Sequence, residues 1–104
     1  MKLTSKQRSY LIGLSNALQP IMQIGKASLT PENTEAINEC FHNNELIKIA
    51  VLKNCDDDPG MIAEAVAGRT HSTVVKVIGK KIILYKPDKD KPKIVLPKAS
   101  AKEN

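Results

Sequence analysis

The sequence predicts an α/β fold (an α+β sandwich) in which three helices lie on a four-stranded mixed sheet, in the order α-β-α-β-α-β-β. Three observations predict it. Capped helical segments alternate with short runs of Leu, Ile and Val, a pattern typical of strand–helix–strand crossovers and parallel strand pairs. Only Gly79-Lys80 separates the last two apolar runs, which predicts a closing antiparallel hairpin. The length of 104 residues suits one domain with one modest core.

The first helix is expected over residues 5–18, where three leucines recur at helical spacing. Thr4 and Gln7 have the spacing of a capping box, in which each side chain binds the backbone N–H of the other residue. Pro20 ends this helix, and residues 21–24 follow as a short strand.

The other two helices each start with a capping side chain followed by proline. Thr30-Pro31 opens the second helix, which is expected to run to residue 43. Asp58-Pro59 opens the third helix. Its end stays open in the sequence, at either Gly68 or Thr70.

The remaining strands are expected at residues 46–53, 74–78 and 81–85, which are rich in Leu, Ile and Val and bounded by turn residues. Gly79 occupies the first position of the two-residue turn between the last two strands. A glycine there favours a type II′ turn. Pro87 then closes the predicted fold.

We expect one domain over residues 1–97 and a disordered basic tail over residues 98–104, which could begin as early as residue 88. The apolar residues 94–96 could instead dock as an extra edge strand. No apolar run approaches the ~20 residues of a membrane helix, and the N-terminus lacks the apolar stretch of a signal peptide. We therefore expect a cytoplasmic monomer with no membrane partner. Cys40 and Cys55 are expected to be reduced thiols, with Cys40 in the core.

The net charge of +5 is unevenly distributed along the chain. The first thirty residues carry four cations and no acid, residues 31–70 carry eight acids against three cations, and residues 71–85 carry three lysines and no acid. This segregation favours a polyanionic partner such as nucleic acid, because a basic face can neutralise phosphates while the acidic segment faces elsewhere. A soluble protein that is merely rich in lysine is the alternative.

Residues 25–28, which read Gly25-Lys26-Ala27-Ser28, lie between the first strand and the second helix. The glycine permits a tight turn, Lys26 lies at its tip, and the first free N–H groups of the helix would attract an anion. The glycine loop of KH-type RNA binders clamps phosphates in this way. A Gly-Lys turn before a helix is also common in proteins without such a function.

Lys48 and Lys76 interrupt otherwise apolar strands, and the head of each side chain must reach water. One face of the sheet is therefore expected to be partly open, with Lys81 or Lys86 joining these two lysines. Solvated edge positions are the alternative. The chain has only three aromatic residues, so base stacking can contribute little, and recognition of backbone and shape fits better.

Catalysis and metal binding have little support in the sequence. His42 and His71 are isolated from any nucleophile. The three acids of residues 56–58 directly precede a helix, where carboxylates act as caps and partners of the helix dipole. No phosphate-binding P-loop or dinucleotide motif is present. We expect no enzymatic activity, no cofactor, no metal and no small-molecule substrate.

Several blocks of the sequence resemble the YhbY-like family, the stand-alone bacterial form of the CRM (chloroplast RNA splicing and ribosome maturation) domain. The resemblance covers roughly residues 3–97. Its blocks, in the family's order and spacing, are LTSKQR at 3–8, PIMQIG at 20–25, ELIK at 45–48, VKVIGK at 75–80 and LYKP at 84–87.

The resemblance implies an α/β fold similar to the C-terminal domain of bacterial translation initiation factor three. It also implies RNA binding and association with precursors of the large ribosomal subunit. The family loop is typically Gly-x-x-Gly, whereas Ser28 stands here in place of the second glycine. If that position requires a positive φ, the serine costs stability.

Together, these arguments predict an RNA-binding protein that takes part in ribosome assembly. The candidate RNA-binding residues are Gly25, Lys26, Ala27, Ser28, Lys6, Arg8, Lys48, Lys76 and Lys80. The alternative is a protein–protein adaptor on the ribosome or its assembly factors, which would use the acidic middle of the chain and the helix faces.

Overall fold

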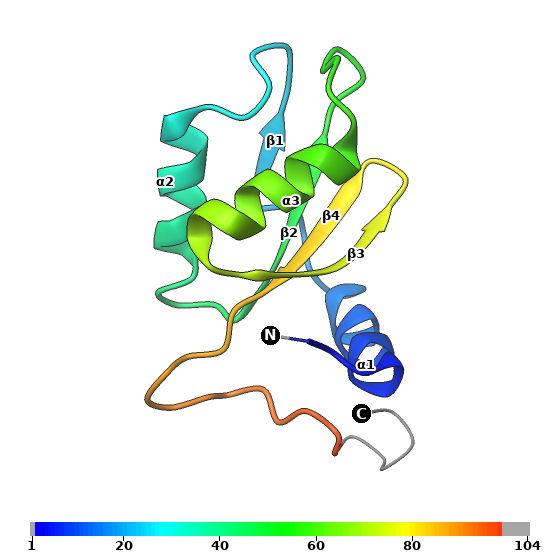
Figure 1. Cartoon of the computed structure of the whole chain (residues 1–104), viewed down its shortest axis with the longest axis vertical. Helices are drawn as coiled ribbons and strands as arrows, with labels where there is room; N and C mark the ends of the chain where they lie inside the picture. The colour runs from blue at the N-terminus through cyan, green and yellow to red at the C-terminus, as the bar shows by residue number, and fades with distance from the viewer. Residues whose placement is uncertain (1, 99–104) are drawn as a thin grey trace.

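The computed structural model describes residues 2–98 and has the predicted order of helices and strands (Figure 1). The elements are α1 (Ser5–Ser15), β1 (Met22–Ile24), α2 (Pro31–Cys40), β2 (Leu46–Val51), α3 (Pro59–Thr70), β3 (Thr73–Ile78) and β4 (Lys81–Tyr85). The four strands form one sheet in the order β1-β2-β4-β3. The β1–β2 pair is parallel and the other two pairs are antiparallel, so the sheet is mixed, as predicted.

All three helices begin where the capping signals predict. Thr4 and Gln7 form the capping box, in which each side chain accepts a backbone N–H of the other residue at 3.1 Å. Thr30 and Asp58 cap α2 and α3 by accepting the N–H of the third helical residue. A proline follows each of these two caps, as expected.

The C-terminal ends differ more from the predictions. α1 stops at Ser15, and a hydrogen bond of 3.0 Å from Leu18 N to the Ser15 carbonyl continues the chain as a turn. α2 ends three residues early, and β2 ends at Val51 rather than residue 53. Gly68 does not stop α3, which runs on until His71 adopts the left-handed conformation with φ 57°.

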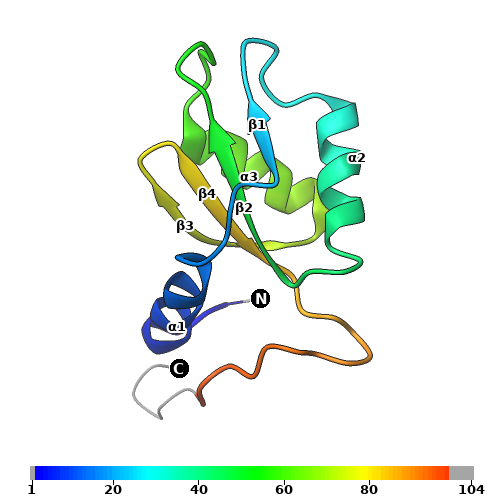
Figure 2. The same cartoon turned by 180° about the vertical axis from the view of Figure 1, so that it is seen from behind.

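The sheet separates two apolar clusters, with α2 and α3 on one face and α1 on the other (Figures 1 and 2). Alternation along β4 shows the division: Ile82 and Leu84 belong to the α2/α3 cluster, whereas Ile83 and Tyr85 belong to the α1 cluster. All four side chains are at most 2% exposed. Each such burial contributes about 1.5–3 kcal/mol, and burial on both faces explains why this strand is apolar throughout.

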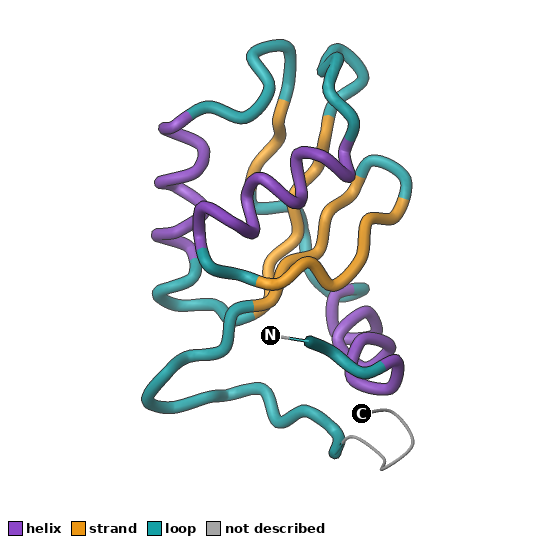
Figure 3. Tube along the Cα trace, in the orientation of Figure 1, coloured by secondary structure: helices purple, strands orange, loops and turns teal. Residues whose placement is uncertain are grey.

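The segment after β4 is held against the domain by Glu45, whose own side chain is buried. One carboxylate oxygen accepts the N–H groups of Lys93 and Ile94, and the other accepts that of Asp88, all at 2.7 Å. Ile94 and Leu96 lie against the α1 cluster. Residues 94–96 therefore dock as an irregular segment and do not form an edge strand (Figure 3).

Residues 86–98, which we call the strap, are thus attached to the domain. The sequence had allowed a mobile tail from residue 88 instead. The Gln7 amide also donates to the Pro97 carbonyl at 3.1 Å. Apart from Lys98, the predicted tail over residues 98–104 lies outside the described residues.

Two smaller predictions have mixed outcomes. Gly79 has a positive φ of 58° and Lys80 does not. A positive φ at the first turn position alone fits the expected type II′ turn. Both cysteines are free, but Cys55 is the buried one and Cys40 is only partly buried. The prediction for Cys40 is therefore confirmed only in part: its side chain packs against the α2/α3 cluster but is not fully buried. No helix within residues 2–98 has the length and apolar character needed to cross a membrane.

Candidate nucleic-acid interface

The loop of residues 25–28 is a β-turn that projects beyond the end of β1. The Ser28 N–H donates to the Gly25 carbonyl at 2.9 Å, and Lys26 and Ala27 at the tip are exposed. Within residues 2–98, no protein acceptor is recorded for the N–H groups of Lys26 and Ala27. The loop thus presents one ammonium group and two backbone donors to solvent, a combination that suits a phosphate.

The two ends of this loop restrict side chains for different reasons. Ser28 has φ 59°, so the structure meets the condition under which serine costs stability in place of glycine, about 1–2 kcal/mol. Gly25 has no positive φ. A Cβ there would lie 3.3 Å from Asn54 Oδ1 and 3.5 Å from Leu52 Cδ1. The first position is small because the neighbouring loop approaches it closely.

The start of α2 offers less to an anion than the sequence suggested. Pro31 has no N–H, the Asn33 N–H donates to Thr30 Oγ1 at 3.1 Å, and the Thr34 N–H donates to the Thr30 carbonyl at 3.0 Å. Glu32 adds a carboxylate to the first turn. The expected anion site at this helix terminus is therefore largely closed by the cap, and the exposed donors are those of the loop.

Three loops meet at the same edge of the sheet (Figure 1). The pairing of Ile24 with Val51, and the 2.7 Å bond from Val51 N to the Lys80 carbonyl, bring the ends of β1 and β2 beside the β3–β4 turn. Each loop carries an exposed lysine: Lys26, Lys53 or Lys80. We call these three residues the edge lysines.

Lys53 was not among the predicted site residues, because the sequence placed it at the end of a strand. The structure ends β2 at Val51, so that Lys53 lies in the β2–α3 loop. The turn residue Asn54, directly after it, is the signal that could have indicated a loop position.

Lys48 and Lys76 lie on the same face of the sheet, the face that α1 partly covers. Lys48 on β2 and Lys76 on β3 both pair with Ile83 on β4, the strand that lies between them. Lys81 precedes Ile83 by two positions and shares its face. Lys76 and Lys81 are exposed and Lys48 is half-buried. Lys86 does not join them, because its ammonium lies 5.9 Å from the centre of the Phe41 ring.

A β-bulge turns Lys76 toward this face. Val74 pairs with Leu84 and Lys76 with Ile83, which leaves Val75 as an extra residue of β3. If β3 alternated regularly from Val75, which faces the α1 cluster, Lys76 would point into the α2/α3 core; the bulge instead places both residues on the α1 side.

Arg8 supports the bulge. Its guanidinium donates to the Val74 carbonyl at 3.2 Å and also to the Val75 carbonyl, the two residues at which the regular pairing of β3 with β4 is interrupted. Lys6 lies two residues away and therefore about 200° around the helix, at 3.6 residues per turn. The structure thus separates these two predicted residues, and Arg8 has a structural partner on β3.

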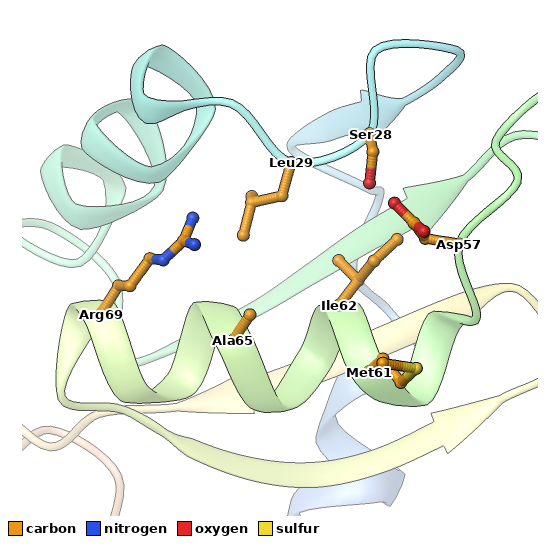
Figure 4. A pocket seen from close by; sticks show the side chains of 7 residues that line it. All are labelled: Ser28, Leu29, Asp57, Met61, Ile62, Ala65 and Arg69. Carbon is orange, nitrogen blue, oxygen red and sulfur yellow. The ribbon is translucent and has the colours of Figure 1, made fainter.

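Two acidic residues, Asp57 and Asp58, lie at the start of α3, which packs on the other face of the sheet. Asp58 caps α3, and its Oδ2 accepts the Met61 N–H at 3.2 Å. Asp57 faces Ser28 across a cavity beside α3 (Figure 4). No group of three or more His, Cys, Asp or Glu side chains within residues 2–98 could hold a metal ion. Lys48, Lys76 and Lys81 therefore lie on the α1 face of the sheet, whereas Asp57 lines a cavity on the α2/α3 face.

The two histidines have local structural roles. His42 Nδ1 lies 3.4 Å from the Glu39 carboxylate on the surface, and His71 ends α3 in its left-handed conformation.

Comparison with known proteins agrees with the fold and with the resemblance in the sequence. A protein called "Probable RNA-binding protein YqeI" from Bacillus subtilis is 39% identical over 95 residues, which cover 91% of this chain and 99% of the relative. A protein called "RNA-binding protein" from Haemophilus influenzae is 31% identical over 96 residues, covering 92% and 96%. The solution structure of SAV1595 from Staphylococcus aureus superimposes with a TM-score of 0.78 at 40% identity, covering 92% of this chain and all of that one.

The family model that matches is that of the CRS1 / YhbY (CRM) domain, over residues 3–86. This match spans every helix and strand of the structure, from the cap of α1 to the end of β4. The chain therefore belongs to the CRS1/YhbY (CRM) domain family.

Proposed function

We propose that this chain is a non-enzymatic RNA-binding protein that holds the phosphate backbone of ribosomal RNA in precursors of the large ribosomal subunit. The observation that carries the proposal is the convergence of three loops, each with an exposed lysine, at one edge of the sheet. The names of two relatives support RNA as the partner. The ribosomal part rests on the family resemblance in the sequence.

The binding mode follows from the chemistry at this edge. Lys26 and the two free N–H groups of its loop would bind one or two phosphates, and the other edge lysines would extend the contact. The RNA backbone would then pass over the open part of the sheet, where Lys48, Lys76 and Lys81 would contact its phosphates. The acids near α3 repel phosphate and direct the RNA to the opposite side. Contacts of this kind read backbone and shape, as is common for folded RNA.

The salt dependence of RNA affinity tests the role of Lys26. Replacing Lys26 by alanine should weaken binding to structured ribosomal RNA and lower the log–log salt slope by about 0.7–0.9, the contribution of one phosphate contact. Lys89→Ala is the matched control, because this exposed lysine belongs to the strap, a segment that runs at the end of the molecule away from the three loops (Figure 1). An unchanged slope in Lys26→Ala would remove this residue from the interface.

The identity of the RNA needs a measurement in cells. Crosslinking followed by sequencing of the attached RNA should recover ribosomal RNA of large-subunit precursors. Recovery of messenger RNA or small-subunit RNA instead would contradict the ribosomal part of the proposal. Binding that is insensitive to salt and needs a ribosomal protein would favour an adaptor over an RNA binder.

A further inference from the structure

A groove runs between α2 and α3, on the face of the sheet opposite Lys48, Lys76 and Lys81. It contains two adjoining cavities of about 260 and 510 Å³, which share Leu29 and Arg69 in their linings. Leu29, Ile62 and Ala65 form an apolar floor beside α3 (Figure 4). Met61 stands at one end of the groove and is 72% exposed, so its side chain is accessible to a partner that occupies the apolar floor.

The surroundings of the groove are acidic. Glu35 lines the cavity beside α2, and Asp57 lines the one beside the loop. Exposed carboxylates continue on α2 and on the loop before α3, at Glu32, Glu39 and Asp56. Arg69 is the one cation in the two linings. Within residues 2–98, the one ion pair joins Glu39 to His42, so the carboxylates of the groove are available to a partner.

The charge determines which class of ligand suits the groove. A nucleic acid would bring its phosphates against Glu35 and Asp57, and like charges at close range are unfavourable. A cationic protein segment would instead place lysine or arginine beside these carboxylates. The apolar floor would accept a large aliphatic or aromatic side chain, and the Arg69 guanidinium could donate to the main-chain carbonyls of the segment.

We infer that this groove binds a basic, extended segment of another protein, anchored by one or two apolar side chains. From Met61 to Arg69 the α3 wall is about 12 Å long, at 1.5 Å per helical residue. An extended chain rises about 3.3 Å per residue, so the groove accommodates roughly four residues of such a segment. The inference goes beyond the proposed function and does not depend on RNA binding, because its anchors lie on α2 and α3 and only the Ser28 end of the groove adjoins the RNA loop.

The test uses a short synthetic peptide of alternating lysine and leucine, with amide chemical shifts of the isotope-labelled full chain as the readout. The peptide should shift the amides of Leu29, Ile62 and Ala65. Glu35→Lys should weaken its binding about fivefold, because an exposed ion pair becomes a repulsion. Glu64→Lys makes the same charge change on α3, outside the groove lining, and should weaken binding less than twofold.

Several outcomes would overturn the inference. One is equal weakening by Glu64→Lys and Glu35→Lys, which would indicate general charge attraction without a groove. Others are binding of the same peptide with glutamate in place of lysine, and oligouridine shifts at Ile62 and Ala65, away from the RNA loop, which would assign the groove to RNA. Groove shifts that depend on protein concentration without peptide would assign it to a second copy of the chain.

Discussion

Replacing Glu45 by glutamine should release the strap from the domain. The buried carboxylate accepts three backbone N–H groups at 2.7 Å, two on one oxygen and one on the other. A glutamine keeps one acceptor oxygen, turns an amide NH₂ toward the remaining donor and removes the charge from all three bonds. Hydrogen bonds to charged groups contribute about 1.5–3 kcal/mol each, so we expect a loss of about 2–3 kcal/mol in the free energy of unfolding.

Two measurements check this expectation. Urea denaturation should show the lower midpoint, and hydrogen exchange should show faster exchange at the amides of Lys93 and Ile94. Glu64→Gln is the matched control, because it makes the same substitution at an exposed site on α3, where a change within about 0.5 kcal/mol is usual. A Glu45→Gln chain as stable as that control, with both amides still protected, would refute the role of Glu45.

Three further predictions concern the loop, the bulge and the core. Ser28→Gly should raise the free energy of unfolding by up to about 1 kcal/mol, because relief of the left-handed strain exceeds the added entropy of the unfolded chain. Urea denaturation reports the sign, and a lower free energy of unfolding would contradict the loop geometry. Arg8→Gln should cost about 1 kcal/mol through the carbonyls of the bulge, and unchanged amide shifts along β3 would argue against this contact. Burial, with a smaller effect of a neighbouring carboxylate, raises the pKa of Tyr85 above the ordinary value of 10.0. The folded state therefore retains this proton longer, and the resulting stabilisation is present below pH 10 and is lost as the pH rises through the folded pKa; tyrosinate absorbance in Tyr10→Phe, where Tyr85 is the sole tyrosine, should show a midpoint above 10.

Helix starts could be predicted from the sequence because their signals are local. A capping side chain and the following proline act within one turn, and Thr4, Thr30 and Asp58 all cap as expected. Helix ends depend on tertiary contacts and were placed less well. Gly68 does not end α3, because the helix continues over the sheet with Thr70 buried.

The position of Lys76 shows what sequence patterns cannot supply. The sequence expected Lys48 and Lys76 on one open face, and the structure places them there. Strict alternation from the buried Val75 would have turned Lys76 to the other face, and only the bulge corrects it. The carbonyls exposed by that bulge are bound by Arg8, from a helix 66 residues earlier in the chain, a contact with no local signal.

Glu45 is the second feature that the sequence does not reveal. It reads as an ordinary acid before a strand, and its importance depends on three N–H groups from residues 43 to 49 positions later. The strap therefore looked like a tail. Lys53 was missed for a related reason, since the end of β2 depends on its pairing with β1 rather than on composition.

The central claim, that the three loops at one edge of the sheet hold an RNA backbone, is tested most directly by removing the edge lysines together. The chain with Lys26, Lys53 and Lys80 replaced by glutamine is compared with one in which Lys89, Lys91 and Lys98 of the strap are replaced, so that both lose the same charge. With structured ribosomal RNA, the account predicts a log–log salt slope lower by about 2–3 in the edge variant and nearly unchanged in the strap variant. Equal slopes in the two variants would show that net charge, and not this edge, holds the RNA.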